Sequence, residues 1–306
     1  MPSDEAAGRR SKAPQCRPHA GECVDGAEGK ARKGPVAKAP RPSRICPMSM
    51  SPTPGDPDAA AVTAERPGWL APIEWAAMAA ASALWMTLAL RLAATESASS
   101  RWGWVVVGVA LGYLAADFFS GIVHWFCDTF FEETTPLIGR MLIEPFREHH
   151  RDALAMTRHG LAEIAGNSCL AVAPLLGAVA FLAPPATGAP LSLAAHAALL
   201  SFAVGAVITN QFHKWAHLPA PPRAVLRLQR AGLVLRPAHH AGHHRTQAEA
   251  YCVATGWLNP VLDQIGFFPA AERGLCALGL PMSVTAPRWR EAQRLRRNGP
   301  PPRRNG

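Results

Sequence analysis

The chain has 306 residues, a formal net charge of +9 and a hydrophobic content of 49%, which together allow one large domain or two small ones. Its seven cysteines form no C-x-x-C pair, so neither a zinc ribbon nor a disulfide scaffold is indicated. The positive charge lies mainly near the two ends and lacks the interleaved aromatic residues of nucleic-acid-binding proteins, which favours anionic phospholipid over nucleic acid as its partner.

The first segment, residues 1–70, is rich in Pro, Ala, Gly, Lys and Arg and shows no apolar periodicity. This composition predicts a disordered basic leader. The segment lacks the pattern of a secretory signal peptide, and Met48 and Met50 are alternative start positions close to the predicted folded part. We therefore expect a leader at 1–70, a membrane domain at 71–270 and an arginine- and proline-rich tail at 271–306.

Four apolar segments follow, each close to the length of about 20 residues that crosses a bilayer. They are Ile73–Thr95, Trp102–Phe126, Leu161–Pro184 and Leu191–Phe212. Buried helices of a soluble α-helical protein are the alternative, but lysine and arginine are almost absent from these segments, which favours a membrane. The sequence thus predicts an all-α integral membrane protein with about four transmembrane helices.

The order of these segments also predicts a topology. If they cross in turn, the leader, the connection 127–160 and the chain after residue 212 share one side, and the loops 96–101 and 185–190 share the other. Four arginines of the connection lie on the first side: Arg140, Arg147, Arg151 and Arg158. By the positive-inside rule we expect that side, with both termini, to be cytoplasmic.

The histidines gather on that same side. Of the twelve, all except His19 and His196 fall into five blocks: His124, His149-His150, His159, His213–His217 and His239–His244. Imidazole is a good ligand for iron, zinc, copper and nickel, and residues four apart share one face of a helix. The pattern therefore predicts a cytoplasmic, histidine-rich cap that binds metal.

Eight or more imidazoles exceed the three or four ligands of a single zinc site, so two metal ions are the simplest arrangement. The blocks contain no cysteine, which disfavours an iron–sulfur cluster. Two histidine-bound irons at a membrane surface can activate dioxygen and attack an unactivated C–H bond of a lipid chain. Glycine-rich phosphate loops and the G-x-S-x-G and H-E-x-x-H motifs are missing, so phosphoryl transfer, serine hydrolysis and thermolysin-like proteolysis have no support.

Six runs of residues carry a resemblance. They read DFFSGIVHW at 117–125, PFREHH at 145–150, TRH at 157–159, TNQFHKWAH at 209–217, HHAGHH at 239–244 and YCVATGWLNP at 251–260. In content and order they resemble the plasmanylethanolamine desaturase family, to which the plant plastid desaturases that act on phosphatidylglycerol are more distant relatives. The resemblance covers roughly residues 100–270 and leaves out the leader and the tail.

The resemblance implies an O2-dependent membrane desaturase that introduces the 1′,2′ vinyl ether double bond into 1-O-alkyl (plasmanyl) ethanolamine phospholipids to make plasmalogens. It implies two iron ions, dioxygen as co-substrate and an external electron-transfer protein. By position, the family's di-iron histidines correspond to His124, His149, His150, His213, His217, His240, His243 and His244. His159 and His239 match histidines as well, without an assigned role. Carboxylates commonly orient metal-bound histidines, and the nearby ones are Asp117, Glu148 and Asp152.

Some of these assignments have alternatives. Adjacent side chains point in different directions. Either both histidines of the pair His149-His150 are ligands, or one of them is only a hydrogen-bonding neighbour of the site. In the pair His239-His240 the H-x-x-H-H spacing makes His239 the expected non-ligand. Gly160 stands where the family often has an acidic residue, which weakens the case for a carboxylate-paired His159 ligand.

Two basic residues and the function itself also have alternatives. Arg147 and Lys214 either hold a lipid phosphate or meet head groups as exposed charges. A related fatty-acyl lipid desaturase or hydroxylase is the alternative enzyme. A non-catalytic membrane regulatory protein is the alternative outside enzymes.

Overall fold

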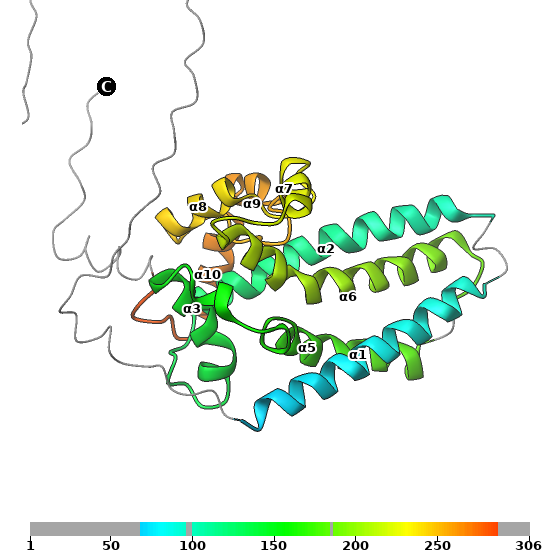
Figure 1. The fold of residues 1–306 in the computed structure, drawn as a ribbon, viewed down its shortest axis with the longest axis horizontal. Helices are drawn as coiled ribbons and strands as arrows, with labels where there is room; N and C mark the ends of the chain where they lie inside the picture. Colours follow the sequence, from blue (N-terminus) through cyan, green and yellow to red (C-terminus); the bar gives the residue numbers. More distant parts are fainter. Residues whose placement is uncertain (1–67, 96–99, 184–185, 287–306) are drawn as a thin grey trace, which may run out of the picture. The chain divides into compact units, whose positions relative to one another are not determined.

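The computed structural model describes residues 68–95, 100–183 and 186–286 (Figure 1). The expected leader up to residue 67 and the tail from residue 287 lie outside these ranges. Across the described ranges the regular structure is helical, apart from one isolated antiparallel bridge between Phe130 and Met282. The predicted all-α fold is confirmed.

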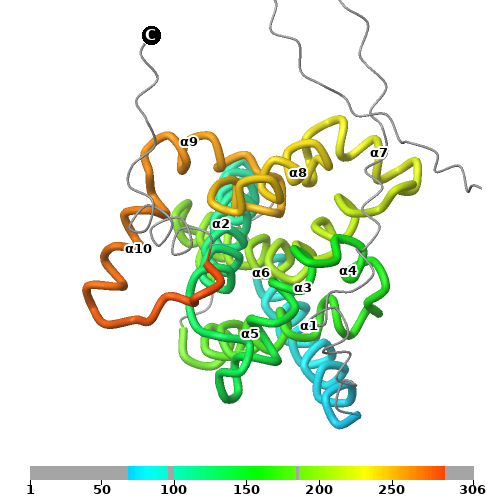
Figure 2. Tube along the Cα trace, turned by 90° about the vertical axis from the view of Figure 1, so that its left-hand side faces the viewer, coloured from blue at the N-terminus to red at the C-terminus, as the bar shows by residue number. Residues whose placement is uncertain are grey.

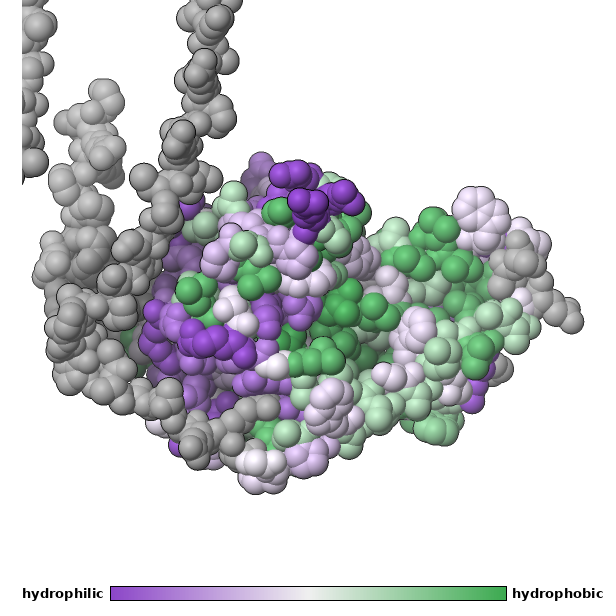
Figure 3. Space-filling view, viewed as in Figure 1, coloured by the Kyte–Doolittle hydropathy of each residue, from purple (hydrophilic) through white to green (hydrophobic). Residues whose placement is uncertain are grey.

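Four of the described helices are long and apolar enough to cross a membrane, as predicted. They are α1 (Leu70–Ala93), α2 (Trp102–Thr129), α5 (Leu161–Leu182) and α6 (Pro190–His217). α2 and α6 end later than expected, at Thr129 and His217, because the polar residues after each apolar stretch continue the same helix. Figure 3 shows hydrophobic residues gathered over the long helices and hydrophilic ones at one end.

The extra length of α2 and α6 matters for the position of the histidines. Each has 28 residues and is therefore about 42 Å long, against about 30 Å for the hydrocarbon core of a bilayer. When both helices begin at one edge of that core, their last turns project beyond the opposite edge. His124 and His213 lie in these last turns.

Small residues let α2 and α6 pack closely. Gly108, Gly112 and Ala116 recur every four residues along α2 and form one stripe. A Cβ placed on Gly112 would lie only 2.1 Å from the carbonyl oxygen of Ala198 in α6, so the two backbones are in direct contact there. This contact sets the register that brings the ends of α2 and α6 together.

We expect Gly112→Val to separate α2 from α6 and to destabilise the protein by about 1–3 kcal/mol, the usual range for overpacking. Thermal unfolding in detergent, followed by size-exclusion elution, measures the effect. Gly103→Ala on the same helix is the control, because a Cβ there meets nothing within 4 Å. Equal melting temperatures for the two variants would contradict the close packing.

The shorter helices form a cap over one end of the long ones. In chain order they are the π-helix η2 (Gly139–Ile143) and the α-helices α3 (Glu144–Arg151), α4 (Ala155–Arg158), α7 (Arg223–Arg230), α8 (Pro237–Thr246), α9 (Asn259–Gln264) and α10 (Phe267–Ala277). Figure 2 shows them arranged around the ends of α2 and α6.

An aromatic cluster fixes the cap to the end of α2. The ring of Phe268 in α10 lies 5.6 Å from Trp125 of α2 and 4.8 Å from Tyr251, measured between ring centroids. All three side chains are buried. Burial of large aromatic side chains is a major source of packing energy, so this cluster holds the last turns of α2 in place.

Candidate metal centre

The structure brings together all eight histidines that the sequence predicts as metal ligands. Their ring nitrogens fall into two groups, and within each group the candidate atoms lie within 4.8 Å of one another. The first, here called the four-residue site, consists of His124, Asp128, His150 and His243. The second, here called the five-histidine site, consists of His149, His213, His217, His240 and His244.

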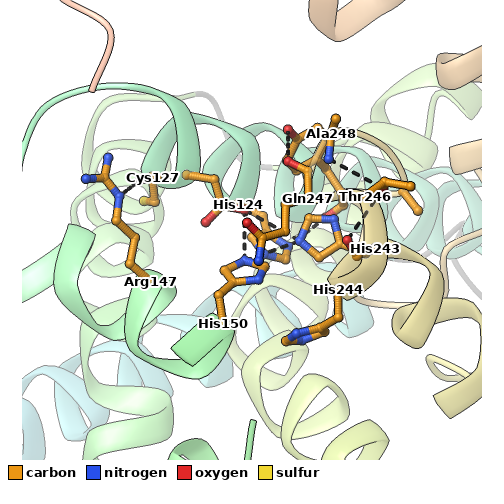
Figure 4. A network of polar contacts seen from close by, with 12 residues as sticks. His124, Cys127, Arg147, His150, His243, His244, Thr246, Gln247 and Ala248 are labelled. Carbon is orange, nitrogen blue, oxygen red and sulfur yellow. Dashed lines mark hydrogen bonds and ion pairs between the residues drawn. The ribbon is translucent and has the colours of Figure 1, made fainter. Parts of the chain in front are cut away.

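In the four-residue site three imidazoles surround one carboxylate. Asp128 Oδ2 lies 3.4 Å from Nε2 of His124, 3.1 Å from Nε2 of His150 and 3.5 Å from Nε2 of His243. Figure 4 shows these three histidines converging from α2, α3 and α8. The arrangement offers three nitrogen atoms and one oxygen atom to a common point.

In the five-histidine site His240 is central. Its Nε2 atom lies 2.8, 2.9 and 3.0 Å from the Nε2 atoms of His213, His217 and His244. With metal–nitrogen bonds of about 2.1 Å, donors at right angles around one ion are about 3.0 Å apart, and tetrahedral donors about 3.4 Å. The observed separations are close to those that ligands of one ion would have.

Two adjacent pairs each contribute one histidine to each site. His149 belongs to the five-histidine site and His150 to the four-residue site, with 4.3 Å between their ring centroids. His244 and His243 divide in the same way. The divergence of neighbouring side chains, which made one member of His149-His150 a possible non-ligand, instead places the two in different groups.

The buried nitrogens need a partner that hydrogen bonds in the described structure do not supply. Both ring nitrogens of His149, Nε2 of His124, and Nδ1 of His213 and His240 have no hydrogen-bond partner there. Leaving buried polar atoms unpaired costs about 1–3 kcal/mol each. A metal ion in each group would satisfy His124 Nε2 in the four-residue site and one ring nitrogen of His149 in the five-histidine site. A set of imidazoles with one carboxylate suits iron and zinc.

The protonation state of the cap histidines agrees with metal binding. Burial lowers the pKa of His149 and His240 well below the usual value, and neighbouring imidazoles lower it further. Both rings are therefore neutral at physiological pH. A neutral imidazole has the lone pair that a metal ion requires.

Backbone carbonyls orient two of the rings in the four-residue site. His124 Nδ1 donates to the carbonyl of Tyr251 at 3.1 Å, and His243 Nδ1 donates to the carbonyl of Glu249 at 2.7 Å. These bonds place the proton on Nδ1 and leave Nε2 free to face Asp128. Such outer partners commonly fix the tautomer and direction of a metal-binding histidine.

Asp117 holds the loop that follows Tyr251, the residue whose carbonyl accepts from His124. Its carboxylate accepts the backbone N–H groups of Thr255 and Gly256 at 2.7 and 2.9 Å, and that of Leu258 at 3.2 Å. It thereby docks the segment after Tyr251 against α2. The expectation that Asp117 orients a histidine directly is wrong, because its oxygens bind backbone instead.

The other two predicted carboxylates are also engaged elsewhere. Asp152 pairs with Arg158 at 2.7 Å on the surface, and Glu148 lies 4.0 Å from His159. Within the described structure the carboxylate among the site histidines is Asp128, which sequence reasoning missed. Its signal was present, since Asp128 follows His124 by four residues and so shares its helix face.

The other histidines of the described ranges lie outside both groups. His159 Nε2 is 3.8 Å from Glu163, so it does have an acidic neighbour, although not at position 160. His239 Nε2 accepts a hydrogen bond from Asn259 Nδ2 at 2.8 Å, in agreement with its expected place outside the site. His196 donates to the carbonyl of Ser192 within α6.

Arg147 has a structural position that excludes both alternatives given for it, a lipid phosphate ligand and an exposed charge among head groups. It is buried, and its guanidinium donates to the carbonyls of Cys127, Phe130 and Phe131 and to the hydroxyl of Ser283. Figure 4 shows it directed from α3 toward Cys127, away from the histidines. It therefore ties the helix of His149 and His150 to the end of α2.

Lys214 is likewise occupied. Its ammonium group donates to the carbonyl of His159 at 2.7 Å and so connects α6 to the start of α5. Arg147 and Lys214, the two candidates for binding a lipid phosphate, thus both donate to backbone carbonyls. The charges available to head groups lie elsewhere on the cap.

Comparison with known proteins adds to this geometry. Residues 113–279 match the lipid desaturase domain family. The chain is 43% identical over 208 residues to the plasmanylethanolamine desaturase of Myxococcus xanthus, covering 66% of this chain and 70% of that protein. It is 40% identical over 176 residues to plasmanylethanolamine desaturase 1 of Mus musculus, covering 55% and 64%.

A more distant relative is the chloroplastic fatty acid desaturase 4 of Arabidopsis thaliana, 35% identical over 169 residues, with 53% of this chain and 48% of that protein covered. No solved structure matches the chain. The matched family region contains all eight predicted histidines and Asp128.

Proposed function

The chain belongs to the lipid desaturase domain family, and from this premise we propose that it introduces the 1′,2′ vinyl ether double bond into 1-O-alkyl (plasmanyl) ethanolamine phospholipids. Membership makes it a membrane desaturase, an oxidoreductase of lipid metabolism. The two relatives named as plasmanylethanolamine desaturases are more similar to the chain than the chloroplastic enzyme, which favours the ether lipid as substrate.

The observation that carries this proposal is the pair of adjoining sites. We assign the eight histidines and Asp128 as the ligands of two iron ions, one in each site. When bound, two irons would supply the activation of dioxygen that an unactivated C–H bond requires. The chain contributes by holding the rings in fixed tautomers, as the Nδ1 bonds of His124 and His243 show, and by excluding water around them.

The overall reaction requires an external reductant. The O–CH2–CH2 unit of the alkyl chain becomes O–CH=CH and gives up two hydrogen atoms. With two electrons and two protons from outside, these reduce one dioxygen to two waters. We therefore propose an external electron-transfer protein as partner. The expected positive-inside topology, with the cap and both termini in the cytoplasm, would place the sites where such a donor can reach them.

The fatty-acyl desaturase remains the second candidate because of the likeness to the chloroplastic enzyme. It would place the new double bond in an acyl chain and leave the ether linkage unchanged. The two functions use the same ligand geometry. They are distinguished by their products.

Expression in a host that makes ether phospholipids tests the proposal. We expect acid-labile vinyl ether with the intact chain and a loss of at least about a hundredfold with His243→Ala, since even outer partners of metal ligands matter by 10–100-fold. His196→Ala, outside both sites, is the control and should retain activity. Lipids are quantified by mass spectrometry before and after mild acid.

Other products decide between the alternatives. A hydroxylated ether lipid would favour a hydroxylase, and a new double bond in an acyl chain would favour the fatty-acyl desaturase. Full activity of the His243→Ala protein would contradict the proposed site. A cellular effect that survives this substitution, without any lipid change, would favour a non-catalytic regulatory protein.

A further inference from the structure

One side of the cap exposes a set of large apolar side chains. The set, here called the collar, comprises Leu228, Leu233, Trp257, Val261 and Ile265, which are 36–65% exposed. Trp257, Val261 and Ile265 are four residues apart; Trp257 precedes α9, Val261 lies within it and Ile265 caps its end. Exposed apolar residues on a protein outside the membrane are normally scattered. Leu233 and Trp257 lie close together instead, because the Trp257 ring donates to the carbonyl of the neighbouring Gly232.

Contacts with α2 give the depth of the collar. The Tyr113 hydroxyl donates to the carbonyl of Leu233, and the ring centroids of Tyr113 and Trp257 lie 6.1 Å apart. Tyr113 is 11 residues after Trp102, about 16 Å along the helix axis. With the exposed Trp102 at the far edge of a hydrocarbon core of about 30 Å, the Leu233 turn lies within that core.

The collar continues a surface of α2 that faces lipid. Trp102, Val106 and Val109 are about half exposed or more, and with Tyr113 they follow the spacing of a single helix face. The collar meets α2 at the last member of this stripe. Tyr113 thus joins this stripe of α2 to Leu233 and Trp257 of the collar.

Four backbone groups of the turn between α7 and α8 are hydrogen-bonded, two of them to aromatic side chains. The Gly232 carbonyl accepts from Trp257 Nε1 at 2.7 Å, and the Leu233 carbonyl accepts from Tyr113. The Leu233 N–H donates to the carbonyl of Leu228, and the Leu235 N–H donates to that of Ala254. An exposed loop in water has no need of tryptophan and tyrosine donors, whereas unpaired backbone in lipid is very costly.

The charges of α7 are arranged for a lipid surface. At 100° per residue, Arg223, Arg227 and Arg230 fall within one stripe of about 60°, and Ala224 and Leu228 fall beside it. All five are exposed, while Val225 and Gln229 on the opposite face are buried. Figure 3 shows hydrophilic residues gathered over α7, next to apolar surface. This is the pattern of an interfacial helix.

We propose that the collar is inserted in the bilayer leaflet on the histidine side, with the three arginines of α7 extended toward the phosphates of its phospholipids. The protein thus contacts the membrane through part of its cap as well as through its four long helices. This inference does not rest on the reaction proposed above. It follows from the depth of the collar, its contacts with α2 and the charges of α7.

Spin labelling in vesicles tests the proposal. The full chain is reconstituted with metal in three parts phosphatidylcholine to one part phosphatidylglycerol, in a background where Cys16, Cys23, Cys46 and Cys276 are serine. Nitroxides are placed by cysteine substitution at Leu233, Ile265 and Arg227. Val106→Cys, on the lipid-facing stripe, is the bilayer control, and Glu249→Cys, exposed beside the metal sites, is the water control.

Collision rates with oxygen and with nickel–ethylenediaminediacetate report the surroundings of each label. We expect the oxygen-to-nickel ratio at Leu233 and Ile265 to match Val106 and to exceed Glu249 severalfold, and the ratio at Arg227 to lie between the controls. Ratios like that of Glu249 would overturn the proposal by placing the collar in water. Shielding from both reagents would also overturn it, by placing a protein partner or a second copy on the collar.

Discussion

Replacing His240 with alanine is expected to remove metal from the five-histidine site and to lower desaturase activity by more than about a hundredfold. The reason is its central position, with its Nε2 atom within 3.0 Å of the Nε2 atoms of His213, His217 and His244. Without His240, the other four histidines of the site would surround the space left by its ring and would offer the ion an incomplete set of ligands. Metal content measured by plasma mass spectrometry should fall from about two ions per chain to about one.

The control for this prediction is His196→Ala, which removes a half-buried histidine whose ring donates to the Ser192 carbonyl within α6. Both variants must elute as the intact protein does, so that loss of metal is not loss of fold. His240→Gln, which keeps volume and a polar end, is the second variant if the alanine form is unstable. Two ions and full activity in either variant would contradict the assignment.

The parts of the structure that could be read from the sequence depend on local properties. Hydropathy over about 20 residues is enough to locate a membrane helix, and α1, α2, α5 and α6 were found in this way. The histidines were found because their residue type is informative wherever they lie. The helix ends at Thr129 and His217 were missed because hydropathy stops at the last apolar residue, whereas helical hydrogen bonding does not.

The parts that could not be read depend on distant contacts. The division of His149-His150 and His243-His244 between two sites follows from the placement of α3 and α8, which no spacing in the chain specifies. Tyr251 meets His124 across 127 residues. Arg147 was a candidate for phosphate because its burial against α2 is invisible in the sequence.

Asp128 was also missed in the sequence, because its burial among the histidines depends on distant contacts. It lies in the four-residue site with a buried carboxylate, whose Oδ1 atom has no hydrogen-bond partner in the described structure and whose Oδ2 atom faces three imidazoles. A buried carboxylate is unfavourable unless hydrogen bonds or a cation compensate its charge, and the ring of His150 lies within hydrogen-bond distance of Oδ2, at 3.1 Å. Asp128 is therefore the residue through which metal and stability are most tightly coupled.

We expect Asp128→Asn to lower metal affinity of the four-residue site by at least about a hundredfold and to abolish activity, while the five-histidine site keeps its ion. Its effect on stability should change sign with metal. With metal bound, the intact chain should melt at a higher temperature than the variant. The negative carboxylate of Asp128 compensates the positive charge of the ion, whereas the neutral amide of asparagine does not. After chelation, the asparagine variant should melt at an equal or higher temperature, because it no longer buries a charge that the surrounding imidazoles compensate only in part.

A purely structural role for Asp128 would lower the melting temperature of the variant in both states, and so the sign change separates the two explanations. Asp152→Asn is the matched control, since it makes the same chemical change in an exposed pair with Arg158. Exposed pairs contribute about 0–1 kcal/mol, so this control should leave metal content and both melting temperatures nearly unchanged. Asp128 contacts His124, His150 and His243, which all belong to its own site, so one retained ion would also show that the two sites fill separately.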